Sequence, residues 1–262
     1  MGESDRSNAG QGTIDGEVFH AALFDMDGVL TRTALVHATA WKRLFDEFLK
    51  DYGGLALRPL EPFDIDKDYR RYMDGRLRYE GVQSFLTSRG ITLPYGSPND
   101  SPQQDTICGL GNRKDDYFQA ALDEHGVAVF EDGVQLLIDL WGAGLKTAVV
   151  SASKHAKSVL KQTSLTEMID ILIDGYESER LHLPGKPSPD TFLEAARRLC
   201  VSPRMAIVVE DALAGISAAR AGGFGLVVAI DRVGQGKALQ DAGASLVVSD
   251  LSTIVIVPKS KL

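Results

Sequence analysis

Four carboxylates follow directly after short apolar segments of the chain. Asp25 and Asp27 come after one apolar run, and Glu210 and Asp211 come after another. If these runs are strands of a parallel sheet, the four side chains meet at its carboxyl edge, where open α/β sheets bind their ligands. Carboxylates brought this close repel one another unless a cation binds or protons are taken up. Because a set of oxygen-only ligands suits Mg²⁺, the sequence predicts Mg²⁺ as a cofactor.

A hydroxyl and a lysine lie in comparable places. Ser151 follows a further apolar run at the start of an expected helix, where a serine can cap the helix or help to bind an anion. Lys186 lies in the segment 185–190, which two prolines stiffen. With Mg²⁺ and the aspartates, this set suits phosphoryl transfer. One aspartate can attack phosphorus as a nucleophile while another moves the proton.

The elements that must position these residues alternate between strands and helices. Runs rich in Val, Ile, Leu and Phe predict buried strands at 18–24, 145–150, 205–209, 224–230 and 245–248. Helical patterns lie between them at 134–141, 154–163, 189–200 and 212–221. This order predicts an α/β fold with a doubly wound parallel sheet.

The stretch between the first two expected strands has helical periodicity and no convincing strand. One apolar helical face comprises Trp41, Leu44, Phe45, Phe48 and Leu49, and further helices are expected at 68–89 and 113–125. The segment 94–111, rich in Gly, Pro, Ser and Asn, predicts a surface loop. We therefore expect a helical cap, 33–128, inserted into a core of 17–32 and 129–262, after a disordered tail, 1–16.

Taken in order, these motifs resemble those of a known superfamily. The run Asp25-Met26-Asp27-Gly28-Val29, then Ser151, Lys186 and Glu210-Asp211, is similar to the four motifs of the haloacid dehalogenase superfamily of aspartyl phosphotransferases. The resemblance covers about 19–248, and the insertion lies where that family carries its small type I cap. It implies that Asp25 is the nucleophile and Asp27 the general acid/base. It also implies a phosphate site at Ser151 and Lys186 and a metal site at Asp25, Asp27 (through its carbonyl), Glu210 and Asp211.

Within this superfamily the chain resembles the β-phosphoglucomutase family. The likeness is carried by Thr33, His37, Ala40-Trp41, Ser151-Ala152-Ser153-Lys154 and Ala214-Gly215-Ile216. It implies interconversion of β-glucose 1-phosphate and glucose 6-phosphate through an aspartyl-phosphate enzyme and β-glucose 1,6-bisphosphate. The further residues implied to contact substrate or its second phosphate are Ser153, Lys154, Arg78, His37, Trp41, Arg113 and Lys114.

A mutase must hold both ends of a sugar bisphosphate, so it needs cations on the cap as well as in the core. Arg78, Arg113 and Lys114 are the candidates, whereas we interpret Arg76 as a solvated helix charge. A Mg²⁺-dependent sugar-phosphate phosphatase on the same scaffold is the alternative, since the core motifs are common to both. A non-catalytic sugar-phosphate sensor is a third hypothesis, disfavoured by the intact acids and lysine.

Two cap-related positions depart from the mutase pattern. Arg32 occupies a hinge position where the mutases usually carry aspartate, and Asp74 stands where a cap lysine is expected. The cap is also longer, with extra residues before Tyr69 and in the 94–111 loop.

The composition excludes several classes of protein. With 44% hydrophobic and 24% charged residues, it is that of a globular protein, and a net charge of -8 disfavours nucleic acid as a partner. Cys108 and Cys200 cannot form a disulfide framework, and no apolar run could cross a bilayer. We expect a cytoplasmic monomer that acts on small-molecule sugar phosphates, without nucleic acid or membrane partners. The sequence Ser260-Lys261-Leu262 would be a peroxisomal signal only in a eukaryote.

Overall fold

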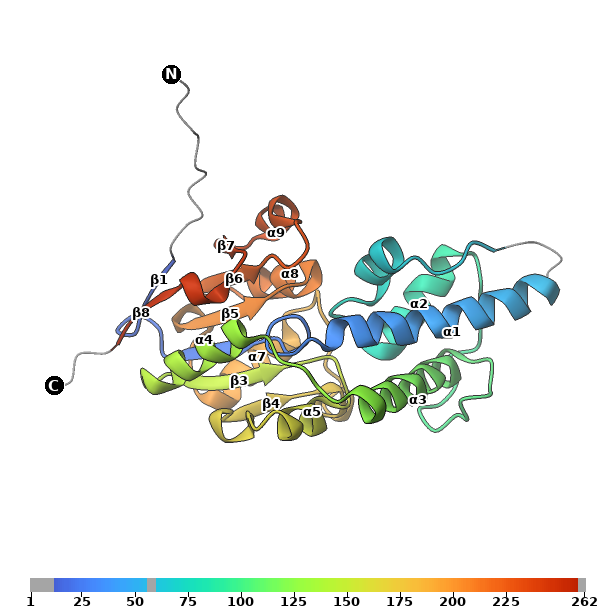
Figure 1. The fold of residues 1–262 in the computed structure, drawn as a ribbon, viewed down its shortest axis with the longest axis horizontal. Coiled ribbons are helices and arrows are strands. Elements are labelled where there is room, and N and C mark those ends of the chain that lie inside the picture. The colour runs from blue at the N-terminus through green and yellow to red at the C-terminus, as the bar shows by residue number, and fades with distance from the viewer. Residues whose placement is uncertain (1–11, 56–59, 259–262) are drawn as a thin grey trace, which may run out of the picture.

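The core of the protein is a six-stranded parallel sheet, seen in a computed structural model that describes residues 12–55 and 60–258 (Figure 1). The strands lie in the order β4-β3-β2-β5-β6-β7. Their bounds are β2 (Ala21–Phe24), β3 (Lys146–Val150), β4 (Ile171–Ile173), β5 (Ala206–Glu210), β6 (Leu226–Ile230) and β7 (Leu246–Val248). Strand β2 has β3 on one side and β5 on the other, so the strand order reverses beside it. Such a reversal opens a crevice at the carboxyl ends of the strands.

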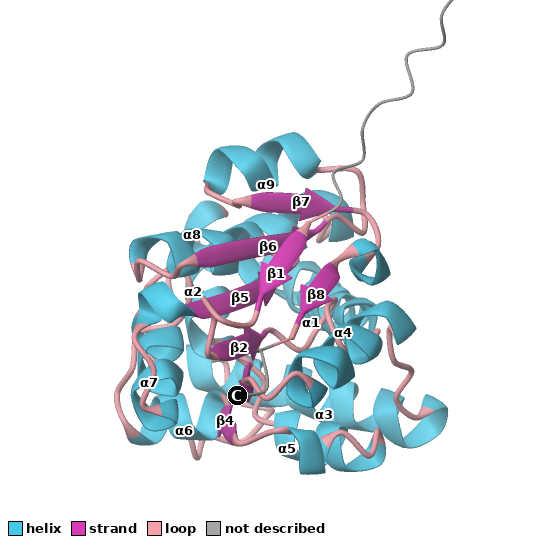
Figure 2. Ribbon diagram, turned by 90° about the vertical axis from the view of Figure 1, so that its left-hand side faces the viewer, coloured by secondary structure: helices cyan, strands magenta, loops and turns pink. Residues whose placement is uncertain are grey.

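Helices cover both faces of this sheet (Figure 2), which confirms the predicted doubly wound fold. On β2, Ala22 and Phe24 face one apolar cluster while Ala21 and Leu23 face the other, as strand geometry requires. The first cluster includes side chains from α4 (Glu131–Gly142) and α5 (Ala156–Gln162). The second includes side chains from α7 (Asp190–Leu199), α8 (Leu213–Ala221) and α9 (Gly236–Ala242). The remaining short core helices are α6 (Gly175–Arg180), η2 (Thr166–Met168), η3 (Pro203–Met205) and η4 (Leu251–Thr253).

A helical cap is inserted between β2 and β3 and lies to the right of the core in Figure 1. It consists of α1 (Thr33–Leu55), the π-helix η1 (Ile65–Met73), α2 (Arg78–Ser88) and α3 (Ile107–His125). The predicted apolar face of α1 is buried in the core of the cap. The two linkers to the core run side by side, because Arg32 N donates to Ala128 O at 2.8 Å and Phe130 N donates to Leu30 O at 2.9 Å.

Several local expectations need correction. The single helix predicted at 68–89 is broken at 74–77, where Gly75 has a φ of +70°. The predicted loop at 94–111 ends early, because Thr106 accepts a hydrogen bond from Gly109 N and caps α3 from Ile107 onward. The first core strand begins at Ala21 rather than at 18. The short elements β4, α6 and α9 were not predicted.

The two ends of the described chain pair with each other. Strand β1 (Thr13–Asp15) runs parallel to β8 (Val255–Val257), so a disordered tail over the whole of 1–16 is wrong at 13–15. Residues 1–11 and the Ser260-Lys261-Leu262 tripeptide lie outside the described residues. No helix in the described part of the chain is both long and apolar enough to cross a membrane.

Candidate active site

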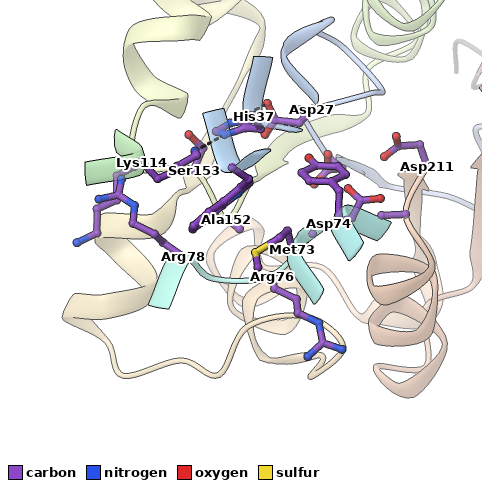
Figure 3. A pocket seen from close by; sticks show the side chains of 16 residues that line it. Asp27, His37, Met73, Asp74, Arg76, Arg78, Lys114, Ala152, Ser153 and Asp211 are labelled. Carbon is purple, nitrogen blue, oxygen red and sulfur yellow. Dashed lines mark hydrogen bonds and ion pairs between the residues drawn. The ribbon is translucent and has the colours of Figure 1, made fainter. Parts of the chain in front are cut away.

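A cavity of about 60 Å³ lies between the cap and the carboxyl edge of the sheet (Figure 3). The core contributes Asp25, Asp27, Ala152, Ser153, Lys154, Asp211 and Ala212 to its wall, and the cap contributes His37, Trp41, Tyr69, Met73, Asp74, Gly75, Arg76, Arg78 and Lys114. Figure 3 shows Arg78, Lys114 and Ser153 at one end of the cavity and Asp74 and Asp211 at the other. The cavity therefore has a cationic end and an acidic end.

Lys186 joins two of the predicted acids beneath the cavity. Its Nζ lies 2.5 Å from Asp25 Oδ1 and 2.7 Å from Glu210 Oε1, and it donates to Val150 O at 3.2 Å. All three charged side chains are buried. Burial raises the pKa of Asp25 well above its ordinary value, and Lys186 only partly offsets this. Burial opposes the charge on Lys186, but Asp25 and Glu210 raise its pKa, so the ammonium group persists at neutral pH.

Glu210 is fixed by the start of the segment that follows its strand. Its Oε2 accepts hydrogen bonds from the backbone N–H groups of Asp211 and Ala212, both at 2.9 Å. Helix α8 can approach this carboxylate only because residue 215 is glycine. A Cβ there would lie 1.6 Å from Glu210 Oε1.

The acids at this edge of the sheet fit a magnesium ion. Asp25, Glu210 and Asp211 each offer a carboxylate oxygen, and these oxygens lie within 4.8 Å of one another. Asp211 Oδ1 is buried without a hydrogen-bond partner among the described residues. Burial, and then the nearby Asp74, raise the pKa of Asp211 well above its ordinary value. A divalent cation would supply the missing partner and relieve this repulsion.

Gly28 makes room for the same carboxylate. It has a φ of +94°, and a Cβ at this position would lie 1.9 Å from Asp211 Oδ2. The side chain of Asp27 is not part of the three-acid cluster. The metal role implied for Asp27 therefore rests on its backbone carbonyl.

Asp27 instead belongs to a polar group shared by the core and the cap. The Thr33 hydroxyl donates to Oδ1, Ser151 Oγ donates to Oδ2 at 3.3 Å, and His37 Nε2 lies 3.5 Å from Oδ1. Burial would raise the pKa of Asp27, but His37 and Thr33 outweigh it and hold the pKa at about 2. Asp27 is thus a carboxylate at neutral pH.

His37 connects Asp27 to a buried lysine. Burial, and then Lys114, lower the pKa of His37 to about 4, so the ring is neutral at pH 7. Its Nδ1 accepts from Lys114 Nζ at 2.6 Å, which leaves the proton on Nε2, facing Asp27. Burial, and then Arg78, lower the pKa of Lys114 to about 7.

Two of the implied phosphate ligands are already paired with acids. Arg78 pairs with Asp115, which also accepts from His155 Nε2 at 2.8 Å, and Lys154 pairs with Glu179. Ser153 lies beside them, and its N–H donates to Ser151 Oγ at 3.1 Å. The cationic end of the cavity is therefore partly neutralised in this structure.

Two arginines lie in places opposite to those expected: Arg113 is outside the cavity, and Arg76 lines it. Arg113 does not line the cavity, since its Nε donates to Pro102 O at 2.6 Å and its Nη2 lies 3.5 Å from Asp105 Oδ1. Neighbouring helix residues point about 100° apart, so Lys114 can face the cavity while Arg113 faces the loop. Arg76, which the sequence suggested to be solvated, lines the cavity and has no acid within ion-pair distance in the described part of the chain.

Sequence reasoning also missed Tyr69, Met73 and Ala212 as wall residues, and treated Asp74 only as a departure. The sequence feature that could have indicated these wall residues is Asp74-Gly75-Arg76. A glycine directly after the helical pattern that ends at Met73 can turn the chain and bring its neighbours against the core.

Comparison with known proteins finds a matching family model, similar sequences and a similar fold. A family model described as haloacid dehalogenase-like hydrolase matches residues 19–223. The chain is 44% identical over 242 residues to a β-phosphoglucomutase of Mycobacterium tuberculosis, covering 91% of this chain and 92% of that protein. It is 28% identical to a validoxylamine A 7′-phosphate phosphatase of Streptomyces hygroscopicus, covering 90% and 96%. The crystal structure of β-phosphoglucomutase from Clostridium difficile matches with a TM-score of 0.70 and 26% identity, covering 89% and 92%.

Proposed function

The chain belongs to the haloacid dehalogenase-like hydrolase family of enzymes, and from this premise we propose that it is a Mg²⁺-dependent β-phosphoglucomutase. It would interconvert β-glucose 1-phosphate and glucose 6-phosphate through an aspartyl phosphate and β-glucose 1,6-bisphosphate. The observation that carries the proposal is a second group of cations, Arg78, Lys114 and Lys154, in the same cavity as Asp25 and Asp27. A bisphosphate needs such a group at the end that is not reacting.

Asp25 would be the nucleophile. Lys186 holds its Oδ1 at 2.5 Å, which leaves Oδ2 to attack phosphorus and form the aspartyl phosphate. Lys186 and Ser151 would then bind the oxygens of the transferring group. A magnesium ion held by Asp25, Glu210 and Asp211 would neutralise negative charge on that group.

Asp27 would carry the proton. Because its pKa is about 2, it begins each transfer to the sugar as a base and takes the proton of the attacking hydroxyl. In the reverse direction, it returns this proton to the leaving oxygen. Thr33 fixes the orientation of the carboxylate during both steps, while the single hydroxyl proton of Ser151 would turn from Asp27 to the phosphoryl oxygens.

A sugar-phosphate phosphatase is the second candidate. Arg78 and Lys154 are each paired with a carboxylate, and Asp74 adds a further acid to the cavity. Both features weaken the affinity for a second phosphate. In this case water, rather than a sugar hydroxyl, would take the phosphoryl group from Asp25.

One assay separates these functions. The protein is mixed with Mg²⁺, β-glucose 1-phosphate and a trace of glucose 1,6-bisphosphate, while glucose 6-phosphate and free phosphate are followed in parallel. We expect glucose 6-phosphate to exceed phosphate greatly, whereas phosphate alone would identify a phosphatase. Asp25→Asn should abolish both products.

Arg78 and Arg113 form a matched pair for the same assay. Arg78→Ala should slow isomerisation more than hydrolysis, because it removes a cation from the proposed second phosphate site. Arg113→Ala should leave both rates near those of the unmodified enzyme, since Arg113 faces the loop. Equal effects of the two substitutions would contradict the assignment.

A further inference from the structure

A second cavity, of about 190 Å³, adjoins the first and is the larger of the two. Its wall includes Tyr79, Tyr95 and Pro98 of the cap and Lys154, Glu179 and His182 of the core. Arg78, Ala152 and Lys154 line both cavities. A ligand that reaches these three residues from the catalytic side therefore meets the entrance to the second cavity.

Two tyrosines give this cavity an aromatic wall. The rings of Tyr79 and Tyr95 are 6.4 Å apart between centroids and nearly perpendicular, at 75°. Tyr79 is held in place because its hydroxyl donates to Asn112 Oδ1 at 2.9 Å. The side chain of Tyr95 is 51% exposed, so about half of its surface has no contact with the rest of the protein. Its ring is thus free to pack against a ligand.

The loop that carries Tyr95 and Pro98 is tied to α3 rather than loose on the surface. Cys108 N donates to Tyr95 O at 3.0 Å. The amide of Asn112 donates to Pro98 O at 3.0 Å and to Asp100 O at 2.9 Å. The same asparagine therefore positions both Tyr79 and the loop, so the aromatic wall exists before any ligand binds.

The arginine and the lysine that line the second cavity are already paired with acids, Arg78 with Asp115 and Lys154 with Glu179, and a further carboxylate, Glu80, also lines it. Glu179 lies on the core side, where it pairs with Lys154, and Glu80 lies on the cap side, where it accepts from Gly185 N at 3.5 Å. Ionised carboxylates accept hydrogen bonds and repel a second anion. The ligand that suits this cavity is therefore neutral, donates hydrogen bonds and offers an apolar face to a tyrosine ring.

We propose that the second cavity is a carbohydrate subsite for a hexopyranosyl group attached to C1 of a hexose 6-phosphate. The proposal rests on the function proposed above, in which one end of the hexose lies at Asp25 and the other at Arg78 and Lys154. With the 6-phosphate at Asp25, C1 lies at the boundary between the two cavities. A second ring on C1 then packs against Tyr95 and donates its hydroxyls to Glu179 and Glu80. The enzyme accordingly binds disaccharide 6-phosphates as well as hexose phosphates.

The test measures binding without turnover, in the Asp25→Asn protein with Mg²⁺, by titration calorimetry. The probes are trehalose 6-phosphate and cellobiose 6′-phosphate, in which a second glucose ring is attached at C1 of the phosphorylated ring with α and β configuration respectively, and glucose 6-phosphate as the reference. We expect at least one disaccharide phosphate to bind about fivefold or more tightly than glucose 6-phosphate.

Tyr95→Ala should remove this advantage and leave the Kd of glucose 6-phosphate unchanged, whereas Tyr95→Phe should retain it. Tyr176→Ala is the matched control, because Tyr176 is 59% exposed and lies 5.2 Å from Lys154 Nζ but does not line the second cavity. The proposal is overturned if neither disaccharide phosphate binds more tightly than glucose 6-phosphate. It is equally overturned if Tyr95→Ala weakens all three ligands alike.

These results are independent of the mutase assay. If glucose 6-phosphate does not form from β-glucose 1-phosphate but the Tyr95-dependent binding is observed, the subsite stands and the mutase proposal fails. If isomerisation occurs without that binding advantage, the mutase proposal stands and the subsite fails.

Discussion

The buried ammonium of Lys114 makes the stability of the protein depend on pH in a way that one substitution can isolate. Its pKa is about 7 in the folded protein, against an ordinary value of 10.5, because it is buried and lies near Arg78. The unfolded chain therefore binds this proton more tightly than the folded protein. Below pH 7 both states hold the proton, so the free energy of unfolding is reduced by the full cost of burying the charge. This cost falls as the pH rises toward 10.5, because the folded protein then releases the proton.

The magnitude follows from the difference between the two pKa values. At about 1.4 kcal/mol for each unit, the full penalty is about 5 kcal/mol. Between pH 7 and 9.5, the unfolded chain still holds a proton that the folded protein has largely released, so about 3 kcal/mol of the penalty is recovered. Lys114→Met removes the titrating group while keeping a long, flexible side chain.

The assay is urea unfolding under reducing conditions at several pH values from 7 to 9.5. The quantity of interest is the free energy of unfolding of Lys114→Met minus that of the unmodified protein, because the contributions of other groups cancel in this difference. We expect the difference to fall by about 3 kcal/mol over this range. Lys237→Met serves as the control for removing a lysine charge, since that side chain is 83% exposed.

A difference for Lys114→Met that stays constant with pH would refute the reasoning, because it would mean that Lys114 binds its proton equally well in both states. The same substitution should weaken sugar-phosphate binding, since Lys114 lines the catalytic cavity. Stability and activity are thus expected to change in opposite directions at pH 7.

Three further predictions concern the site. Gly215→Ala should destabilise the protein by about 1–3 kcal/mol in urea unfolding because its Cβ would overlap Glu210, whereas Gly54→Ala, with no atom within 4 Å, should not destabilise it. Mg²⁺ should raise the Tm of the unmodified protein. Asp211→Asn should raise the Tm measured without metal and should abolish most of the increase that Mg²⁺ causes. An equal Mg²⁺-induced increase in Tm in the variant and the unmodified protein would contradict the metal site. Arg76→Met should increase the KM for β-glucose 1-phosphate about tenfold with little change in kcat, because Arg76 lines the catalytic cavity. If Arg76→Met and Arg113→Met had the same KM, Arg76 would not contact the substrate.

The core of the site could be predicted from the sequence because its position depends on strand ends. A short apolar run such as 205–209 has few alternatives to a buried strand, and the acids that follow it are carried to the sheet edge by the fold itself. Asp25, Asp27, Glu210 and Asp211 were found in this way, whereas Lys186 was singled out because two prolines stiffen its segment.

The cap side of the site was harder to predict because it depends on helix rotation and on one turn. Arg113 and Lys114 are neighbours in sequence, and only the packing of α3 decides which of them faces the cavity. Arg76 and Asp74 reach the cavity through the break between η1 and α2, which periodicity alone does not locate. Strands β1 and β8 were missed because their pairing joins 13–15 to 255–257, and no local pattern encodes a contact of that separation.

The pairing of β1 with β8 also has a consequence for how the protein can be handled. The two strands run side by side at the pole of the core opposite to the cap (Figure 1). A surface tether or a fluorescent fusion attached beyond either strand would therefore leave from the far side of the molecule. A short peptide bridging the two strands could also join them in a circularly permuted chain, with new termini opened in an exposed turn. Immobilised or permuted forms of this kind would leave the approach between cap and core unobstructed.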